Sequence, residues 1–178
     1  MDLLKGEQRG AAHLKRNPLG GVPALEIVDK GKSKFLGESL AIMEWAEENF
    51  PKPSLLPGDS FQKGQIRQLS EIVNSGIHPL HNLKVRNFYS KDEKVAQQWS
   101  KHWIEEGLQA YENLVKETAG KFSVGDTLTM ADLCLIPQCY NAKRYEASFE
   151  QFPTIARIYA EAIKTESYKV SAPEAFQP

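Results

Sequence analysis

The first third of the chain alternates short apolar runs with turn-forming residues. Residues 22–28 and 33–37 form two such runs on either side of an Asp-Lys-Gly-Lys stretch, a pattern typical of a β-hairpin. Apolar positions then recur at helical spacing, with Ser39 as a candidate N-cap and Pro51 as a helix breaker, so we predict a helix over residues 39–50. Its apolar positions are Leu40, Met43, Ala46 and Phe50.

Helical patterning dominates the rest of the chain. Residues 51–59 contain three prolines and one glycine and show no hydrophobic period, which favours a linker. Beyond it, apolar residues recur every three or four positions, with an interruption expected near Pro79 and a kink at Pro137. The predicted helices cover residues 61–85, 92–117, 130–145 and 153–164.

This change of pattern predicts two domains. Residues 1–52 combine the hairpin with one helix and form a small α/β piece, whereas residues 60–178 are predicted to be all-α. The chain of 178 residues is long enough to bury a core, and its 41% hydrophobic and 25% charged residues are ordinary for a globular protein.

Charge and cysteine content narrow the class of protein. The formal net charge is −1, so there is no overall basic field to attract nucleic acid or an anionic membrane. No apolar run reaches the ~20 residues of a membrane-spanning helix, and the first residues lack the features of a secretory signal peptide. Cys134 and Cys139 are too few for a disulfide-stapled scaffold. We therefore expect two free thiols and a cytoplasmic protein.

Three short patterns resemble the glutathione transferases. Residues 21–25, Gly-Val-Pro-Ala-Leu, resemble the strand that carries the cis-proline of thioredoxin-like domains. Residues 38–42, Glu-Ser-Leu-Ala-Ile, resemble the step that opens the following helix, and residues 123–132 resemble the N-capping box of the C-terminal domain. The resemblance covers essentially the whole chain. It implies the glutathione transferase fold, with an α/β thioredoxin-like N-terminal domain, incomplete here, and an all-α C-terminal helical domain.

Two further patterns resemble the zeta class of this family. They are residues 77–83, Ile-His-Pro-Leu-His-Asn-Leu, and residues 141–145, Asn-Ala-Lys-Arg-Tyr. The resemblance implies that His78 and Asn82 bind substrate and that Arg144 binds a substrate carboxylate, since a guanidinium pairs bidentately and stays charged. From position alone, His78 is more often a partly buried helix histidine, and Arg144 complements a helix C-terminus.

The resemblance also implies a glutathione-binding set of Val22, Pro23, Glu38 and Ser39. A cis Val22–Pro23 bond would turn the backbone N–H and C=O of Val22 outward, where the cysteinyl part of glutathione pairs as an added strand. The helix start at Ser39 would hold the γ-glutamyl carboxylate, and Glu38 would hold its ammonium group. The alternatives are a trans proline at the start of a strand and a plain N-cap.

Two other motifs are assigned no catalytic role. Thr129 and Asp132 have the spacing of a capping box, which we interpret as a folding element. His78 and His81 are three residues apart, but Pro79 disturbs a regular helix between them, and no carboxylate or thiolate completes a ligand set. We therefore predict no metal site.

The serine-rich run that carries the reactive hydroxyl in this class is absent from the sequence. The family fold begins with a strand, a helix and a second strand, whereas residues 2–8 resemble the end of that second strand. The missing part would need roughly 25–30 residues. The expected catalytic serine therefore lies upstream of Met1, no catalytic residue is assigned within the chain, and we expect the chain as given to be impaired.

The activity implied by the resemblance is glutathione-dependent cis–trans isomerisation of maleylacetoacetate to fumarylacetoacetate, in tyrosine and phenylalanine catabolism. The substrate would be a small dicarboxylate, glutathione the cofactor, and the assembly a homodimer. Isomerisation of maleylpyruvate and a general zeta-type transferase activity on α-haloacids remain open. A non-catalytic binding module on the same fold also remains open.

Overall fold

The structure of the chain is a computed structural model that describes residues 1–3 and 5–176. The chain divides into two compact units, Met1–Leu55 and Leu56–Pro178, and the division falls inside the predicted linker 51–59. The assignment of the first unit to glutathione binding and of the second to substrate binding stays a prediction.

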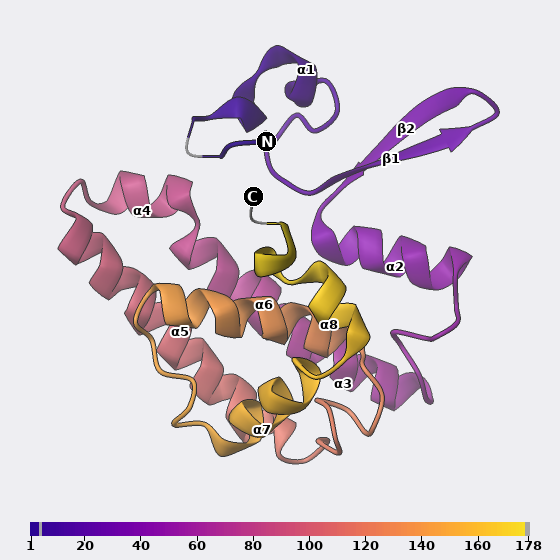
Figure 1. Cartoon of the computed structure of the whole chain (residues 1–178), viewed down its shortest axis with the longest axis vertical. Helices are drawn as coiled ribbons and strands as arrows, with labels where there is room; N and C mark the ends of the chain where they lie inside the picture. Colours follow the sequence, from indigo (N-terminus) through magenta and orange to yellow (C-terminus); the bar gives the residue numbers. More distant parts are fainter. Residues whose placement is uncertain (4, 177–178) are drawn as a thin grey trace. The chain divides into compact units, whose positions relative to one another are not determined.

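Unit 1 contains the predicted hairpin and helix (Figure 1). Its two strands are antiparallel, with a register that runs from Ala24 opposite Gly37 to Asp29 opposite Lys32. The two residues between the strands are Lys30 and Gly31, with φ angles of 49° and 75°. Such a left-handed pair matches the right-handed twist of a hairpin. The elements are η1 (Glu7–Arg9), α1 (Ala11–Leu14), β1 (Ala24–Asp29), β2 (Lys32–Gly37) and α2 (Ser39–Asn49).

The start of α2 differs from the prediction by one residue. Glu38, not Ser39, is the N-cap, and Ser39 is the first helical residue. Glu38 has a φ of 65° and a ψ of 120°, a conformation that few non-glycine residues adopt. The chain therefore turns sharply between β2 and α2 at Glu38, and the helical backbone begins immediately afterwards.

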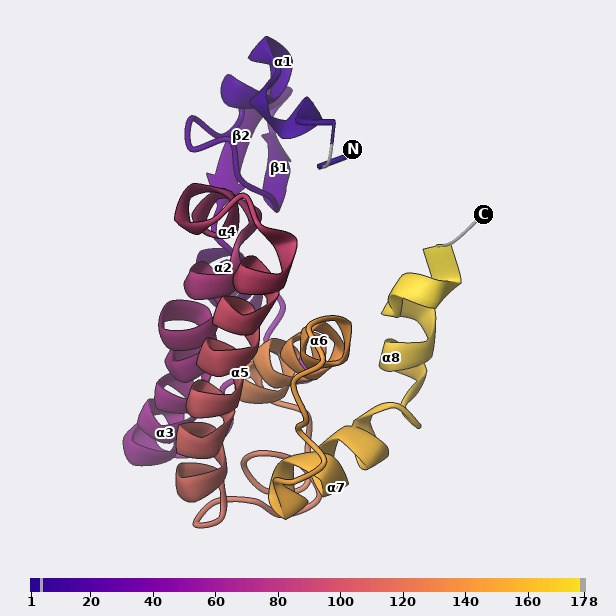
Figure 2. The same ribbon diagram turned by 90° about the vertical axis from the view of Figure 1, so that its left-hand side faces the viewer.

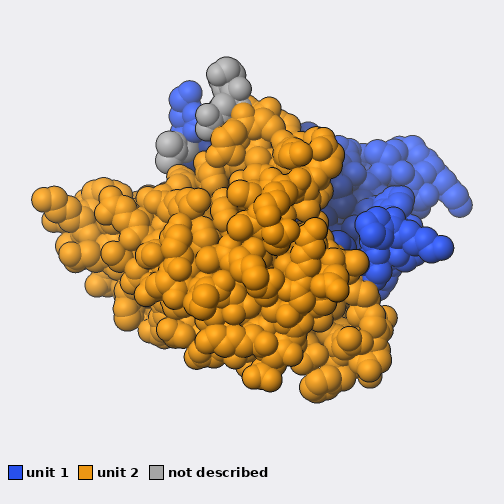
Figure 3. All heavy atoms as spheres, turned by 60° about the horizontal axis from the view of Figure 1, so that its bottom comes forward, with its two compact units in different colours: residues 1–55 blue, residues 56–178 orange. Residues whose placement is uncertain are grey.

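Unit 2, shown in orange in Figure 3, is helical as predicted. The predicted segment 61–85 is broken earlier than Pro79, because a π-helical stretch and a 3-10 turn precede the next α-helix. The proline ring clashes with the carbonyl group four residues before it, which accounts for the widened turn. The elements are α3 (Ser60–Glu71), η2 (Ile72–Ile77), η3 (His78–His81), α4 (Leu83–Tyr89), α5 (Glu93–Val115), α6 (Met130–Arg144), α7 (Pro153–Ala162), α8 (Glu166–Ser171) and η4 (Pro173–Phe176).

The core of unit 2 lies around α5, which has α3 and η2 along one side and α6 and α7 on another (Figures 1 and 2). Ile77 and Gly107 show how closely η2 approaches α5, because a Cβ atom on Gly107 would lie 2.2 Å from Cγ1 of Ile77. No helix in the described part of the chain is both long and apolar enough to cross a membrane. Fully buried core side chains include Ile66, Ile77, Ile104, Leu108, Tyr111, Leu135, Ile155 and Ile158.

Buried carboxylates fix the starts of two helices in this unit. Asp132 Oδ2 accepts hydrogen bonds from the N–H and the hydroxyl of Thr129, both at 2.8 Å, and Asp132 Oδ1 accepts the N–H of Ser123 at 2.8 Å. This confirms the predicted capping box. Glu112 on α5 accepts the N–H groups of Thr154 and Ile155 at the start of α7, at 3.2 and 3.0 Å.

Candidate functional site

The Val22–Pro23 peptide bond is cis, as predicted. The side chain of Val22 is 48% exposed. Within the described residues, no hydrogen bond is made by the backbone N–H or C=O of Val22. The second cis bond, Lys52–Pro53, lies in the linker and was not predicted. The backbone of Val22 is thus available to a partner.

Two buried side chains hold the residue before Val22. His13 Nε2 lies 2.8 Å from the carbonyl oxygen of Gly21, and Asn17 Nδ2 donates to the same oxygen at 3.1 Å. A Cβ atom on Gly37 would lie 3.1 Å from Asn17 Nδ2, so Asn17 also lies against the end of β2. Sequence reasoning missed both residues. A lone histidine in a short helical turn gives no signal, although an asparagine before a proline indicates a turn.

The first turn of α2 lies beside this loop, because Ala24 pairs with Gly37 in the hairpin. The first bond of the helix runs from the N–H of Ile42 to the carbonyl of Glu38 at 3.0 Å. Helix geometry leaves the N–H groups of residues 39–41 without acceptors inside the helix, and no side chain caps them. Glu38 and Ser39 are both exposed. This end of α2 therefore suits an anion.

On unit 2, His78 and Asn82 lie at the two ends of η3. His78 is exposed, although partial desolvation by the surrounding protein lowers its pKa. Asn82 is the N-cap of α4, and its Oδ1 accepts the N–H of Lys84 at 3.2 Å. The capping bond uses the side-chain oxygen Oδ1 of Asn82 and leaves the two N–H groups of its side-chain amide as donors. The structure thus gives Asn82 a folding role that the sequence did not predict.

His81, the last residue of η3, is buried against the second half of α6. Its Nε2 lies 3.0 Å from Oε1 of Gln138 on α6, and its ring centroid is 5.4 Å from that of Tyr145. Burial lowers the pKa of His81, and the nearby His78 and Arg86 lower it further, while the bond with Gln138 opposes them. The imidazole is therefore held neutral. Sequence reasoning considered His81 only as a metal ligand; among the described residues no group of three His, Cys, Asp or Glu could hold a metal ion.

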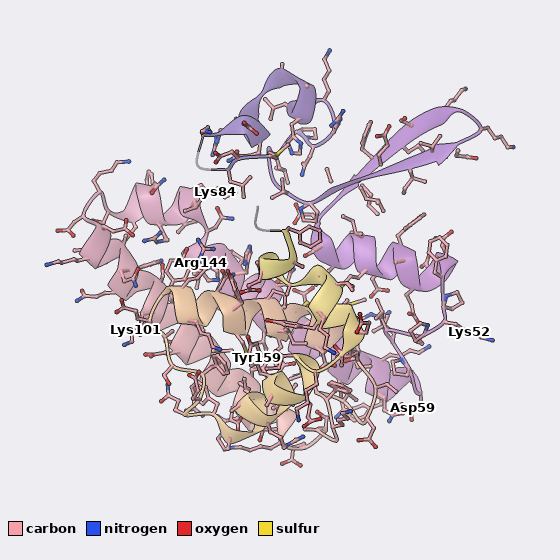
Figure 4. The ribbon with its side chains drawn as sticks, viewed as in Figure 1. Lys52, Asp59, Lys84, Lys101, Arg144 and Tyr159 are labelled. Carbon is pink, nitrogen blue, oxygen red and sulfur yellow. The ribbon has the colours of Figure 1, made fainter. Side chains whose placement is uncertain are left out.

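Arg144 is the last residue of α6 and is exposed (Figure 4). In the part of the chain that the structure describes, no ion pair or hydrogen bond is formed by its guanidinium. Arg86 and Arg157, in contrast, are engaged with Glu93 and with the carbonyl of Gly120. Arg144 is thus available to an anion, and its position in the last turn also complements the α6 C-terminus.

The structure places the predicted residues in two groups. The hairpin register brings Val22 and Pro23 beside the Glu38–Ser39 turn in unit 1. In unit 2, the ring of His81 packs edge-on against His78 at 5.0 Å and also contacts Tyr145, the neighbour of Arg144. The ring of His81 therefore lies between His78 and the residue next to Arg144.

Comparisons with known proteins match both units. The family model for the N-terminal domain of glutathione S-transferase matches residues 2–54, and that for the C-terminal domain matches residues 78–167. A probable maleylacetoacetate isomerase 1 from Drosophila melanogaster is 41% identical over 157 residues, which is 88% of this chain and 61% of the relative. The maleylacetoacetate isomerase of Mus musculus is 40% identical over 88% of this chain and 70% of the relative.

Solved structures extend the match to the three-dimensional fold. A maleylacetoacetate isomerase from Anaeromyxobacter dehalogenans 2CP-1, crystallised with GSH bound in its active site, gives a TM-score of 0.90 at 40% identity, covering 100% of this chain and 82% of the other. A bacterial maleyl pyruvate isomerase of the zeta class gives a TM-score of 0.90 at 36% identity, covering 99% of this chain and 84% of the other. The chain belongs to the zeta class of the glutathione transferases.

The zeta-class assignment confirms the predicted fold class, a thioredoxin-like N-terminal domain followed by a helical C-terminal domain. The chain spans about three fifths of the Drosophila relative and about four fifths of the two solved chains. The predicted serine-rich segment upstream of Met1 stays a prediction.

Proposed function

We propose that this protein is a glutathione-dependent cis–trans isomerase that converts maleylacetoacetate to fumarylacetoacetate. The observation that carries the proposal is its match, over the whole chain, to a maleylacetoacetate isomerase crystallised with GSH in the active site. The geometry of both units supports this activity, because each offers unpaired groups of the kind that the two reactants need.

Unit 1 fits glutathione. The unpaired N–H groups at the start of α2 suit the α-carboxylate of the γ-glutamyl residue, and the exposed Glu38 carboxylate suits its ammonium group. The backbone of Val22, which has no hydrogen bond in the described structure, suits the peptide part as an added strand. When bound, glutathione would supply the thiolate that adds reversibly to the cis double bond. The cofactor-binding residues of the proposal are Val22, Pro23, Glu38 and Ser39.

Unit 2 would bind the dicarboxylate. Arg144 is the main anchor, because an unengaged guanidinium can donate two parallel hydrogen bonds to a carboxylate. The amide of Asn82 and the imidazole of His78 would donate hydrogen bonds to the second carboxylate or to charge that develops on the substrate. Desolvation lowers the pKa of His78, which favours the neutral imidazole as a hydrogen-bond donor in the protein before substrate binds.

Maleylpyruvate is the second candidate substrate, supported by the comparable match to a maleyl pyruvate isomerase. The same residues would serve a shorter diacid. A general zeta-type transferase activity and a non-catalytic binding module remain further alternatives. The expected catalytic serine upstream of Met1, a homodimer and a cytoplasmic location are parts of the proposal that rest on the family resemblance.

The first test is a spectrophotometric isomerase assay with maleylacetone and glutathione, on this chain and on a version with the upstream segment restored. Turnover in the longer form alone supports both the isomerase and the upstream serine. Turnover in both forms shows that catalysis does not need an upstream serine, and turnover in neither form favours the non-catalytic binding module. Maleylpyruvate in the same assay compares the two substrates.

A substitution tests the proposed role of Arg144 in binding a substrate carboxylate. Arg144→Met should raise the KM for maleylacetone about tenfold or more in the active form, because one charge-assisted pair is lost. Lys101→Met on α5 is the matched control, since Lys101 is an exposed cation whose Nζ lies 3.9 Å from a Glu105 carboxylate oxygen one helical turn away. Equal effects of the two changes would show that net charge alone is responsible.

A further inference from the structure

We propose that His81 is a positioning residue for the dicarboxylate site: it fastens η3 to the end of α6 and so holds His78 and Arg144 in a fixed relation. The inference rests on the proposed function, because it gives His81 a role at the site proposed there. It adds a residue that neither touches substrate in the proposal nor belongs to its binding set.

His81 is 3% exposed, so its contacts are with protein alone. Because Oε1 of Gln138 can only accept, the proton of the 3.0 Å bond belongs to Nε2 of His81. Gln138 is itself 2% exposed, and its Nε2 has no partner in the described structure. The hydrogen bond to His81 is therefore the polar contact that fixes the position of the Gln138 side chain.

The ring contacts of His81 reach His78 and Tyr145, the residue that follows Arg144. On one side the ring packs edge-on against His78, at 5.0 Å between centroids. On the other it contacts the ring of Tyr145 at 5.4 Å, and Tyr145 follows Arg144 at the α6 C-terminus. A shift of His81 would therefore disturb His78 directly and Arg144 through Tyr145 at the end of α6.

Tyr145 also contacts a buried arginine, Arg86. The Arg86 guanidinium lies 4.9 Å from the centre of the Tyr145 ring and pairs with Glu93 at 2.5 Å. Arg86 is buried and its Nε has no partner in the described part of the chain. A positive charge so close to His81 disfavours a second cation there. The neutral, hydrogen-bonded form of His81 is thus the one that fits the cluster.

The attachment of η3 to α5 is separate from this cluster. Trp99 Nε1 on α5 donates to the carbonyl of Leu80 at 2.7 Å. This bond remains when His81 is replaced, so a variant at His81 should release η3 from α6 while leaving it on α5. The expected effect is a local change of the site and not a loss of the fold.

The test uses malonate as a probe, since binding does not require turnover. His81→Leu should weaken malonate binding about tenfold in calorimetry, while His81→Gln, which keeps a donor for Gln138, should stay within about threefold of the unchanged protein. Glutathione affinity should not change in either variant, because its proposed residues lie in unit 1. His102→Leu is the matched control, an exposed histidine on α5.

Three results would overturn the inference: unchanged malonate affinity in His81→Leu, equal loss of malonate and glutathione affinity, or failure of His81→Gln to recover binding. If His81→Leu does not fold, Gln138→Met removes the same bond from the other side and should give the same selective loss. The absence of malonate binding in the unchanged protein would count against the proposed function instead.

A measurement without ligand distinguishes a failure of the positioning role of His81 from a failure of the proposed function. The pKa of His78, followed by NMR, should lie below that of an ordinary histidine in the unchanged protein and in His81→Gln. In His81→Leu it should rise, because a loosened η3 would lose the surrounding protein that partly desolvates His78. An unchanged His78 titration in His81→Leu would overturn the positioning role whatever the protein binds.

Discussion

His13 Nε2 lies 2.8 Å from the carbonyl oxygen of Gly21, and this contact joins the short helix α1 to the loop that enters the cis-proline turn. His13 is 6% exposed, so water does not readily replace the bond. Together with Asn17, it fixes the backbone immediately before Val22. The proposed strand-like pairing of glutathione with Val22 therefore depends on a histidine that does not belong to the predicted site.

His13→Phe should weaken glutathione binding. A phenylalanine fills a similar space but cannot donate to Gly21, and the loss of such a bond costs about 1 kcal/mol, which corresponds to roughly fivefold in the dissociation constant. Isothermal titration calorimetry measures it directly. His13→Gln, which retains a donor, should recover most of the affinity, and the same affinity in all three proteins would count against the role of His13.

Asp132→Ala should destabilise unit 2 without acting on the site. The substitution leaves the N–H groups of Ser123 and Thr129 without their acceptor in a buried position, so we expect a loss of about 2–4 kcal/mol in the free energy of unfolding. Urea unfolding gives the value. Asp126→Ala is the control, because Asp126 accepts one exposed N–H, from Lys121, and should cost less. A similar loss in both variants would contradict the special role of the capping box.

The stability of the protein should fall with acidification through the buried histidine. The pKa of His81 is lowered in the folded state, so the unfolded chain takes up a proton at higher pH, near 6.5. The stabilisation is present above that pH and is lost as the pH falls toward the folded-state pKa. His81→Gln removes this titration, so its free energy of unfolding should change less than that of the unchanged protein between about pH 7.5 and 5.5. Equal slopes would contradict the prediction, and His102→Gln serves as control.

Neither cysteine should react readily in the folded protein. Burial raises the pKa of Cys134 to about 11, and burial raises that of Cys139 still further. At about pH 8 only about one Cys134 thiol in a thousand is the reactive thiolate. Iodoacetamide labelling followed by mass spectrometry should show slow modification of Cys134, none of Cys139, and rapid modification of both in denaturant. Rapid labelling of the folded protein would show that the thiols are more accessible than the structure indicates.

Local features of the sequence were sufficient for the hairpin, the longer helices and the family. The hairpin, the helix that follows it and the long helices of unit 2 were predicted, because hydrophobic period, turn residues and capping groups act over a few neighbouring positions. The capping box at Thr129 and Asp132 belongs to this class, since its partners are three residues apart. The cis bond before Pro23 came from the resemblance.

The contacts that organise the candidate site were decided by the tertiary structure. His81 and Gln138 are 57 residues apart, and no local pattern pairs a histidine on a 3-10 turn with a glutamine on another helix. Their bond follows from the packing of η3 on α6, as that of His13 follows from the packing of α1 on the loop. Local patterns along the chain were enough to predict where the longer helices and the hairpin form and which residues could bind an anion. A buried polar group needs a hydrogen-bond partner. For His81 and His13 that partner comes from a different element or loop of the chain, so the pairing depends on how the whole unit packs.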